Sequence, residues 1–138
     1  MMEQGRLNEY FHSQEFACKC GCGIFNLDPD FFDKLTEARR IADVPFVINS
    51  GCRCPSHNKA EGGSQISAHI TTDAIKARGS DIRARTIDVM RAILRAAFEV
   101  DMPGIAIGEG FVHLDTKERK MIKTYAAFTL TARGLFAG

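Results

Sequence analysis

The sequence predicts a single α+β domain with a small central antiparallel sheet flanked by helices. Helix-like and strand-like segments are mixed along the chain, and the strand-like segments gather in its last third. A length of 138 residues is enough for one hydrophobic core of modest size. We expect one domain over residues 1–138, with its core at about 10–128 and a tail at 129–138.

The first half of the chain is expected to contain a cysteine-rich loop, two helices and one strand. Residues 16–25, FACKCGCGIF, are typical of a loop or hairpin. Residues 28–43 predict a helix, because Asp28 is a suitable N-cap and the apolar residues that follow fall on one face. A short buried strand is predicted at 45–51, and a short helix closed by two glycines at 55–63.

The second half is expected to contain a loop, a long helix and three strands. Residues 64–80 form the loop, with one short strand around 73–77 as an option. A helix capped by Ser80 or Asp81 is predicted to continue to about Val100, because its apolar residues recur near the helical period. The strands are predicted at residues 104–110, 111–116 and 123–128. A hairpin of the last two strands is one arrangement of this region.

Composition and charge exclude several classes of partner. Lys and Arg number 18 and Asp and Glu 17, so the net charge of +1 gives no electrostatic reason to bind nucleic acid or an anionic membrane. No apolar run approaches the roughly 20 residues of a membrane helix. The polar N-terminal residues do not resemble a signal peptide. We therefore expect cytoplasmic synthesis, with no nucleic acid and no membrane as partner.

The cysteines suggest a second chemistry. They are Cys18, Cys20, Cys22, Cys52 and Cys54. In a cytoplasmic chain free thiols are the expected state. Five thiols would also be enough for a structural zinc, but the usual motif is Cys-x-x-Cys, whereas both clusters here are Cys-x-Cys. A buried thiol cluster is the ordinary interpretation, and the role of the cysteines stays open at this point.

Three further segments carry candidate site residues. On a strand His113 and Asp115 share one face, so one side chain can bind a metal while the other orients it or handles protons. His69 lies in a polar loop, where Ser67 can fix its ring by a hydrogen bond. Arg53 follows a predicted strand end and is well placed to clamp a carboxylate. Taken singly, each has an ordinary alternative: a solvated His–Asp pair, a surface histidine and a surface arginine.

Together these segments resemble a known family. INSGCRCPSHNKAEGGSQISAH (48–69) and IAIGEGFVHLDT (105–116) are similar to the signature motifs of the zinc D-Ala-D-Ala carboxypeptidases and L-alanyl-D-glutamate endopeptidases, which include many phage endolysins. EFACKCGCG (15–23) is similar to the start of a phage and prophage branch. The resemblance covers about residues 10–128, nearly the whole chain.

The resemblance implies a fold, an activity and a place of action. The fold would be the α+β domain of hedgehog and D-Ala-D-Ala peptidases, with a central antiparallel sheet. The activity would be zinc-dependent hydrolysis of a peptide bond in the peptidoglycan stem peptide. The enzyme would be of phage or prophage origin and would act on the cell wall after release or lysis.

The resemblance also implies roles for individual residues. The family binds Zn²⁺ through His, Asp and His, so His69 would be the first ligand and His113 the last. Arg53 would hold the substrate carboxylate or oxyanion, with Ser67 beside it in the substrate site. Asp115 is the acid of the closing His-x-Asp motif. Such a zinc ion keeps an open position, where it lowers the pKa of water to roughly 7.

The middle ligand departs from the family pattern. That pattern places the aspartate seven residues after His69, where this chain has Lys76, and an ammonium group cannot bind zinc. We take Asp73 as the ligand, in a rebuilt loop. A site that has lost its carboxylate is the second interpretation, and it makes the chain a catalytically impaired peptidoglycan-binding module. Asp81 is the third, although its position predicts the first turn of a helix, where an acid is common.

The general base is the second open point. Some family members carry an acid three residues before the last histidine, where this chain has Gly110. Asp115 is our first candidate, because it shares the strand face of His113. Glu109 is the alternative, because on a continuous strand it would lie on the same face as His113, two pleats away.

Overall fold

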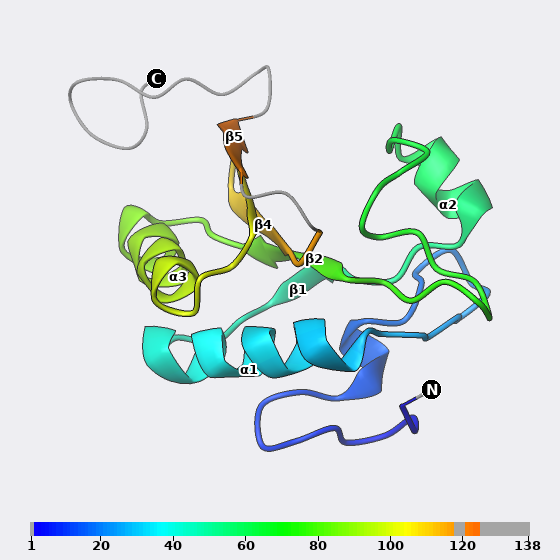
Figure 1. Cartoon of the computed structure of the whole chain (residues 1–138), viewed down its shortest axis with the longest axis horizontal. Helices are drawn as coiled ribbons and strands as arrows, with labels where there is room; N and C mark the ends of the chain where they lie inside the picture. Colours follow the sequence, from blue (N-terminus) through cyan, green and yellow to red (C-terminus); the bar gives the residue numbers. More distant parts are fainter. Residues whose placement is uncertain (1, 118–120, 125–138) are drawn as a thin grey trace.

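The strands form one five-stranded sheet in the order β1-β2-β4-β3-β5 (Figure 1). This computed structural model describes residues 2–117 and 121–124. The strands are β1 (Ile48–Ser50), β2 (Gly79–Arg83), β3 (Gly104–Gly108), β4 (Phe111–Asp115) and β5 (Met121–Thr124). The pairs β1–β2, β2–β4 and β4–β3 are antiparallel, and β3–β5 is parallel. The predicted α+β class is confirmed, with a sheet that is mixed rather than wholly antiparallel.

The helices lie apart from one another in two groups. The α-helices are α1 (Pro29–Ala42), α2 (Pro55–Ala60) and α3 (Ile87–Glu99), and a 3-10 turn η1 spans Ser13–Glu15. Helix α1 contacts α3, and α3 contacts β4. Figure 1 shows α1 and α3 side by side, with α2 well away from both. Helices α1 and α3 therefore do not cover the part of the sheet near α2.

Helix α1 forms where the sequence predicts it. The side chain of Asp28 accepts a hydrogen bond of 2.9 Å from the backbone N–H of Phe31, which makes Asp28 the N-cap. The helix ends at Ala42, and the C-cap residue Asp43 has a left-handed φ of 53°. Its buried side chains are Phe31, Phe32, Leu35 and Ala38. The spacing of these residues gives one apolar stripe that faces the core.

The long helix begins later than the sequence predicts. Residues Gly79–Arg83 form strand β2, and α3 starts at Ile87 with Thr86 as its N-cap. Strand β2 lies between β1 and β4 and pairs with both, so its backbone groups are satisfied on each side. Sheet pairing has outweighed the local helix signals around Ser80 and Asp81. The prediction of a helix start there is wrong.

The hairpin also lies elsewhere than predicted. Strands β3 and β4 form it, with Gly104 opposite Asp115 and Gly108 opposite Phe111. Strand β5 pairs with β3 in parallel and does not form a hairpin with β4. Residues 125–138, which include most of the predicted last strand and the tail, lie outside the described residues.

The core forms between α1, α3 and one face of the sheet. Strand β4 contributes Val112 and Leu114 to it, both fully buried. Phe11, Phe16 and Phe32 pack edge to face, with ring centroids 5.3 to 5.9 Å apart. Because side chains alternate along a strand, the neighbouring residues of β4 face the other side of the sheet.

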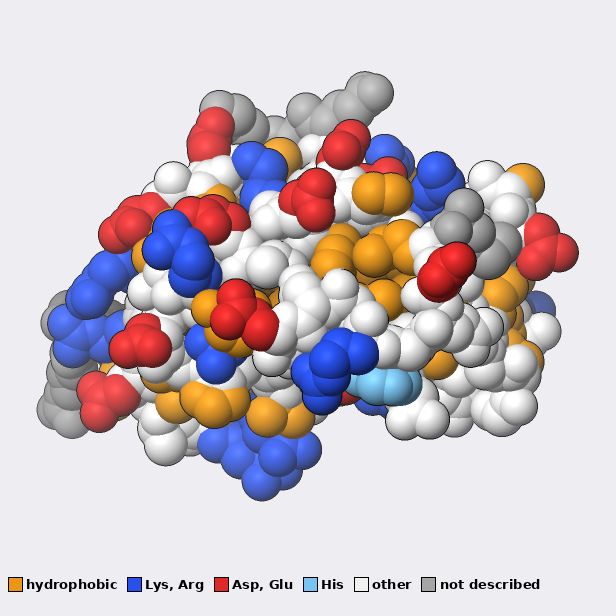
Figure 2. Space-filling model, turned by 90° about the horizontal axis from the view of Figure 1, so that it is seen from below, with side chains coloured by type: hydrophobic (Ala, Val, Ile, Leu, Met, Phe, Trp, Pro, Cys, Tyr) orange, Lys and Arg blue, Asp and Glu red, His pale blue; other side chains and the backbone are white. Residues whose placement is uncertain are grey.

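The outer surface carries both signs of charge. Figure 2 shows basic and acidic side chains interspersed over the face seen from below, around a group of hydrophobic side chains. This mixture agrees with the net charge of +1. Within the described ranges, none of the helices combines the length and apolar character needed to cross a membrane.

Candidate metal centre

Strand pairing places a carboxylate directly opposite an imidazole. Asp81 of β2 and His113 of β4 are partners in the antiparallel register. Directly opposed residues project from the same face, and the atoms Asp81 Oδ1 and His113 Nδ1 are 2.8 Å apart. This face is turned away from Val112 and Leu114, which belong to the core.

A loop between α2 and β2 brings a second imidazole to the same point. The carbonyl of His69 accepts a hydrogen bond of 2.8 Å from the backbone N–H of Arg53. The His69 ring lies with Nδ1 2.7 Å from the carbonyl oxygen of Gly51. Its other nitrogen, Nε2, lies 3.2 Å from Asp81 Oδ1 and 3.2 Å from His113 Nδ1. The three side chains thus converge from three segments.

The donor set fits a zinc ion. One nitrogen of His69, one oxygen of Asp81 and one nitrogen of His113 lie within 4.8 Å of one another. Two imidazoles and one carboxylate are a usual catalytic zinc set, which leaves one position open. The opposite nitrogen of each ring has an acceptor: Gly51 for His69, and Asp115 for His113 at 2.7 Å. Such acceptors fix the tautomer of each neutral ring, so that once a ring gives up its second proton, its nitrogen facing Asp81 can present a lone pair to a metal.

The electrostatics of the cluster favour a positive charge within it. Burial by itself raises the pKa of Asp81, but hydrogen bonds from His113 and His69 outweigh it and hold that pKa well below its usual range. Burial lowers the pKa of His113, but hydrogen bonds to Asp115 and Asp81 outweigh it and raise the pKa to about 9. The buried carboxylates therefore attract a cation: a proton on His113 in the metal-free protein, or a metal ion.

Asp115 occupies the far side of the His113 ring. Its Oδ2 accepts from His113 Nε2, and its Oδ1 accepts a 3.0 Å hydrogen bond from the backbone N–H of Lys117. Burial raises the pKa of Asp115, but the hydrogen bond from His113 outweighs it and lowers that pKa. The carboxylate fits in place only because residue 104 is glycine, since a Cβ there would collide with it. This geometry favours the orienting role for Asp115.

Arg53 lies beside the group of His69, Asp81 and His113 and is held by three acceptors. Its Nε donates to Ser50 Oγ at 2.9 Å, one terminal nitrogen to Asn58 Oδ1 at 3.3 Å, and the other to Asp81 Oδ2 at 3.3 Å. The side chain is 12% exposed. Asn58, itself buried, has its amide nitrogen bound to the carbonyl of Ser64. The guanidinium is therefore fixed in direction, as recognition of a carboxylate requires.

The cluster faces a cleft of about 400 Å³. Arg53, Ser67, His69, Asp81, His113 and Asp115 are among the residues that line it. The hydroxyl of Ser67 accepts a 3.2 Å hydrogen bond from the backbone N–H of His69. The expected bond to the ring is instead made by Gly51. The volume is within the range of small-ligand sites.

The structure does not bring Asp73 to the two histidines. Asp73 is exposed in the loop at residues 72–76, and the described group of metal-binding side chains contains Asp81 in its place. The hydroxyl of Thr72 accepts hydrogen bonds from the backbone of Ala74 and Ile75, which closes this loop on itself. The expectation for Asp73 is therefore corrected in position: the carboxylate that lies beside the two histidines is that of Asp81, a strand residue, and not that of Asp73, a loop residue.

The same loop carries Lys76 away from the two histidines. Lys76 is exposed and does not line the cleft, so its ammonium group does not point at the metal position. Asp81 comes twelve residues after His69, whereas the family pattern places its aspartate seven residues after the histidine. The turn at 72–76 accommodates the additional residues. A site without a carboxylate is therefore not what the structure shows.

Glu109 is not brought to the centre either. It is exposed in the turn between β3 and β4, and it does not line the cleft. The expectation that it shares the face of His113 assumed an unbroken strand, which the turn interrupts.

Asn58 and Gly104 are support residues whose roles the sequence did not reveal. In the sequence, Asn58 is visible only as an asparagine in the segment that also contains Arg53, and Gly104 only as the glycine that begins the apolar run 104–108.

Comparison with known protein families gives a match for this region. A family model described as Peptidase M15 matches residues 9–115. The matched range includes His69, Asp81, His113 and Arg53. A comparison with curated proteins gives no match.

Proposed function

Because the chain belongs to the M15 peptidase family, we propose that it is a zinc-dependent peptidase that hydrolyses a peptide bond in the stem peptide of bacterial peptidoglycan. One observation carries this proposal beyond the family: His69, Asp81 and His113 converge on one point of a cleft that Arg53 also lines. A catalytic metal and a carboxylate-binding group side by side suit a peptide substrate.

The metal would be held by His69 Nε2, one oxygen of Asp81 and His113 Nδ1. When bound, zinc supplies a Lewis acid for the peptide carbonyl and lowers the pKa of water to roughly 7. Asp115 keeps the His113 ring in place by accepting a hydrogen bond from its Nε2, and the carbonyl of Gly51 does the same for Nδ1 of His69. The chain's own residues thus fix the geometry of the ligands.

Arg53 is proposed to bind a carboxylate or the developing oxyanion of the substrate. A terminal nitrogen of its guanidinium lies 3.3 Å from Asp81 Oδ2, so Arg53 is held next to the proposed metal position. The hydrogen bonds to Ser50 and Asn58 remove rotamer freedom before the substrate arrives. Less entropy is then lost on binding. Ser67 lines the same cleft and belongs to the proposed substrate site.

Two bond specificities are compatible with such a site. A D-Ala-D-Ala carboxypeptidase would use Arg53 on the terminal carboxylate of the peptide, and an L-Ala-D-Glu endopeptidase on a side-chain carboxylate or the oxyanion. We propose a phage or prophage origin and action on the wall after release or lysis, on the basis of the motifs quoted above. An impaired binding module is less well supported, because Asp81 supplies the carboxylate whose absence at Lys76 suggested it.

The experiment is direct hydrolysis of defined wall fragments. Zinc-loaded protein would be incubated with a pentapeptide stem ending in D-Ala-D-Ala and with peptidoglycan sacculi, and the products identified by mass spectrometry. Loss of one D-alanine would indicate the carboxypeptidase, and cleavage after L-alanine the endopeptidase. His113→Ala should abolish either product, while Asp73→Ala should leave both unchanged.

Two results would contradict the proposal. The first is intact substrate in the presence of protein that carries its zinc in full. The second is equal cleavage by wild type and His113→Ala, which would indicate a contaminating hydrolase. Tight binding of the stem peptide without any product would favour the binding module instead.

A further inference from the structure

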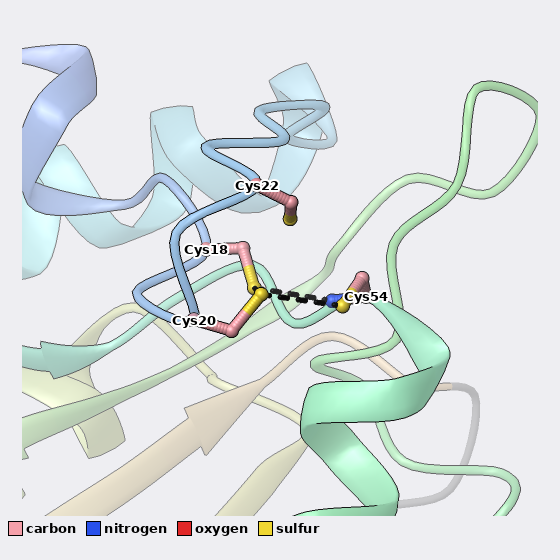
Figure 3. A group of neighbouring side chains, drawn as sticks. All are labelled: Cys18, Cys20, Cys22 and Cys54. Carbon is pink, nitrogen blue, oxygen red and sulfur yellow. Dashed lines mark hydrogen bonds between the residues drawn. The ribbon is translucent and has the colours of Figure 1, made fainter.

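A second cluster of side chains that could hold a metal ion lies outside the cleft. Cys18, Cys20 and Cys22 come from the loop between η1 and α1, and Cys54 comes from the residue before α2. Figure 3 shows these four side chains gathered between the two segments. Their sulfur atoms lie within 4.8 Å of one another, although more than thirty residues separate Cys54 from the others in sequence. The fifth cysteine, Cys52, is buried and is not part of the group.

The sulfur–sulfur distances match ligands around one ion. Cys18 Sγ and Cys20 Sγ are 3.6 Å apart, and Cys20 Sγ and Cys54 Sγ are 3.7 Å apart. Four sulfurs bound tetrahedrally to zinc at about 2.3 Å lie about 3.8 Å from one another. A disulfide would require about 2.05 Å. The spacing is therefore that of a tetrahedral thiolate site.

Hydrogen-bond donors point at two of the sulfurs. The backbone N–H of Cys54 donates to Cys18 Sγ at 3.4 Å, and that of His57 donates to Cys54 Sγ at 3.4 Å. His57 Nδ1 lies 3.2 Å from Cys18 Sγ, and its Nε2 lies 3.2 Å from Glu61 Oε1. Donors of this kind stabilise thiolates and orient them around a metal. With both ring nitrogens engaged, His57 acts as a support for the thiolates rather than as a fifth ligand.

Two glycines allow the loop to return its cysteines to one place. Gly21 has φ of +109° and Gly23 has φ of +68°, conformations that other residues adopt only with strain. They alternate with Cys20 and Cys22, so the Cys-x-Cys-Gly-Cys-Gly sequence specifies a tight, irregular loop. This explains how cysteines spaced by a single residue can share one centre.

We propose that Cys18, Cys20, Cys22 and Cys54 bind a structural zinc ion, separate from the catalytic centre. Four thiolates complete a tetrahedron and leave no open position, so this ion would not take part in hydrolysis. Binding deprotonates the thiols and releases their protons to solvent. A tetrahedral S₄ donor set selects zinc or iron among the common metals.

The ion would fix the segment that carries Arg53. Cys54 follows Arg53 directly, and the backbone N–H of Cys52 donates a 2.7 Å hydrogen bond to the carbonyl of Phe16. The N-terminal loop and the arginine segment are thus joined by a backbone contact at one point and by the proposed ion at another. The proposed function does not depend on this ion, and the ion does not depend on the proposed function.

The test is the zinc content of the full chain and of variants, measured by elemental analysis. Wild type should carry about two zinc ions per chain. The double variant His69→Ala, His113→Ala should keep one, and the double variant Cys20→Ala, Cys22→Ala should also keep one. Cys52→Ala is the matched control, because Cys52 is a cysteine outside the group, and it should keep both.

A spectroscopic measurement covers the case in which the cysteine variant fails to fold. Cobalt loaded into the His69→Ala, His113→Ala variant should show sulfur-to-cobalt charge transfer and the strong visible bands of tetrahedral coordination. The proposal is overturned if that variant holds no metal while its thiols react freely, or if its intact mass reveals a disulfide within the group. Failure of the catalytic centre alone would leave these cysteine signals unchanged, so the two proposals fail separately.

Discussion

Asp81 and His113 face each other across two adjacent antiparallel strands, with Asp81 Oδ1 2.8 Å from His113 Nδ1. This pairing fixes two of the three proposed metal ligands on rigid backbone. The third, His69, is brought in by a loop whose position depends on Arg53 and Gly51. Strand pairs hold side chains more precisely than loops do. The Asp81–His113 pair is therefore the most rigid part of the centre, and the loop positions His69 against it.

Asp81→Asn should remove the carboxylate ligand. We expect the zinc affinity of the proposed catalytic centre to fall by about 100-fold or more, since even an outer partner of a ligand contributes roughly 10- to 100-fold. Asp73→Asn is the matched control and should leave the affinity unchanged, because Asp73 is exposed and outside the group. Titration with a competing chelator measures both. A larger loss for Asp73→Asn than for Asp81→Asn would show that the loop, not the strand, provides the ligand.

Asp115→Asn should weaken the hold on the His113 ring. The asparagine would keep the shape of the side chain but lose the charge that pairs with His113 Nε2. We expect zinc affinity and hydrolysis to fall together, by about 10- to 100-fold. Glu109→Gln, at the exposed turn, is the control and should change neither. If Asp115→Asn lowers kcat while zinc affinity stays at the wild-type value, Asp115 acts as a general base instead.

Gly104→Ala should displace the Asp115 carboxylate. The added Cβ would overlap this carboxylate, so we expect a loss of about 1 to 3 kcal/mol in the free energy of unfolding and a lower zinc affinity. Adding Asp115→Ala removes the overlapping atoms. The double variant should regain stability relative to Gly104→Ala, but not zinc affinity. Denaturant unfolding of the wild type, the two single variants and the double variant gives a double-mutant cycle. If the two changes in unfolding free energy simply add, the two residues do not interact.

Arg53→Lys should impair substrate binding while sparing the metal. Lysine keeps the charge but cannot donate in the planar, two-pronged geometry of the guanidinium. A hydrogen bond to a charged group contributes about 1.5 to 3 kcal/mol, so kcat/KM should fall by about 10- to 150-fold. Zinc content should stay at the wild-type value. Unchanged kinetics would exclude Arg53 from substrate recognition.

The metal-free protein should lose stability as pH rises through the weakly alkaline range. The pKa of His113 is raised from 6.5 to about 9 on folding, so the native state binds more protons than the unfolded state in this interval. The stabilisation is complete below about pH 6.5 and is lost by about pH 9. The pKa values of Asp81 and Asp115 are lowered from 3.8, so their contribution is present above that pH and is lost in acid.

Thermal unfolding in the presence of a chelator measures this dependence. The melting temperature should be highest between about pH 4 and pH 6.5 and should decline toward pH 9. His113→Asn is the control, and its profile should be flatter over the alkaline part. A metal-free wild type whose stability increases from about pH 6.5 to 9 would contradict the charge arrangement described for His113.

The sequence alone determined the features that depend on local spacing. Helix α1, with its Asp28 cap and apolar stripe, forms as predicted, because cap and periodicity lie within one segment. His113 and Asp115 share a strand face because alternation along a strand is a local rule. His69, His113 and Arg53 were predicted from their motifs, and the structure brings all three to one cleft.

Only the tertiary structure decided which aspartate joins the histidines. Residues 79–83 carry signals for a helix start, yet they form β2, because pairing with β1 and β4 satisfies the backbone on both sides and buries Ile82. That change moves Asp81 from a helix turn to a position opposite His113. The meeting of Cys54 with the cysteines of the N-terminal loop has the same origin. Both groups join segments far apart in the sequence, and such contacts follow from strand pairing and packing rather than from the spacing of neighbouring residues.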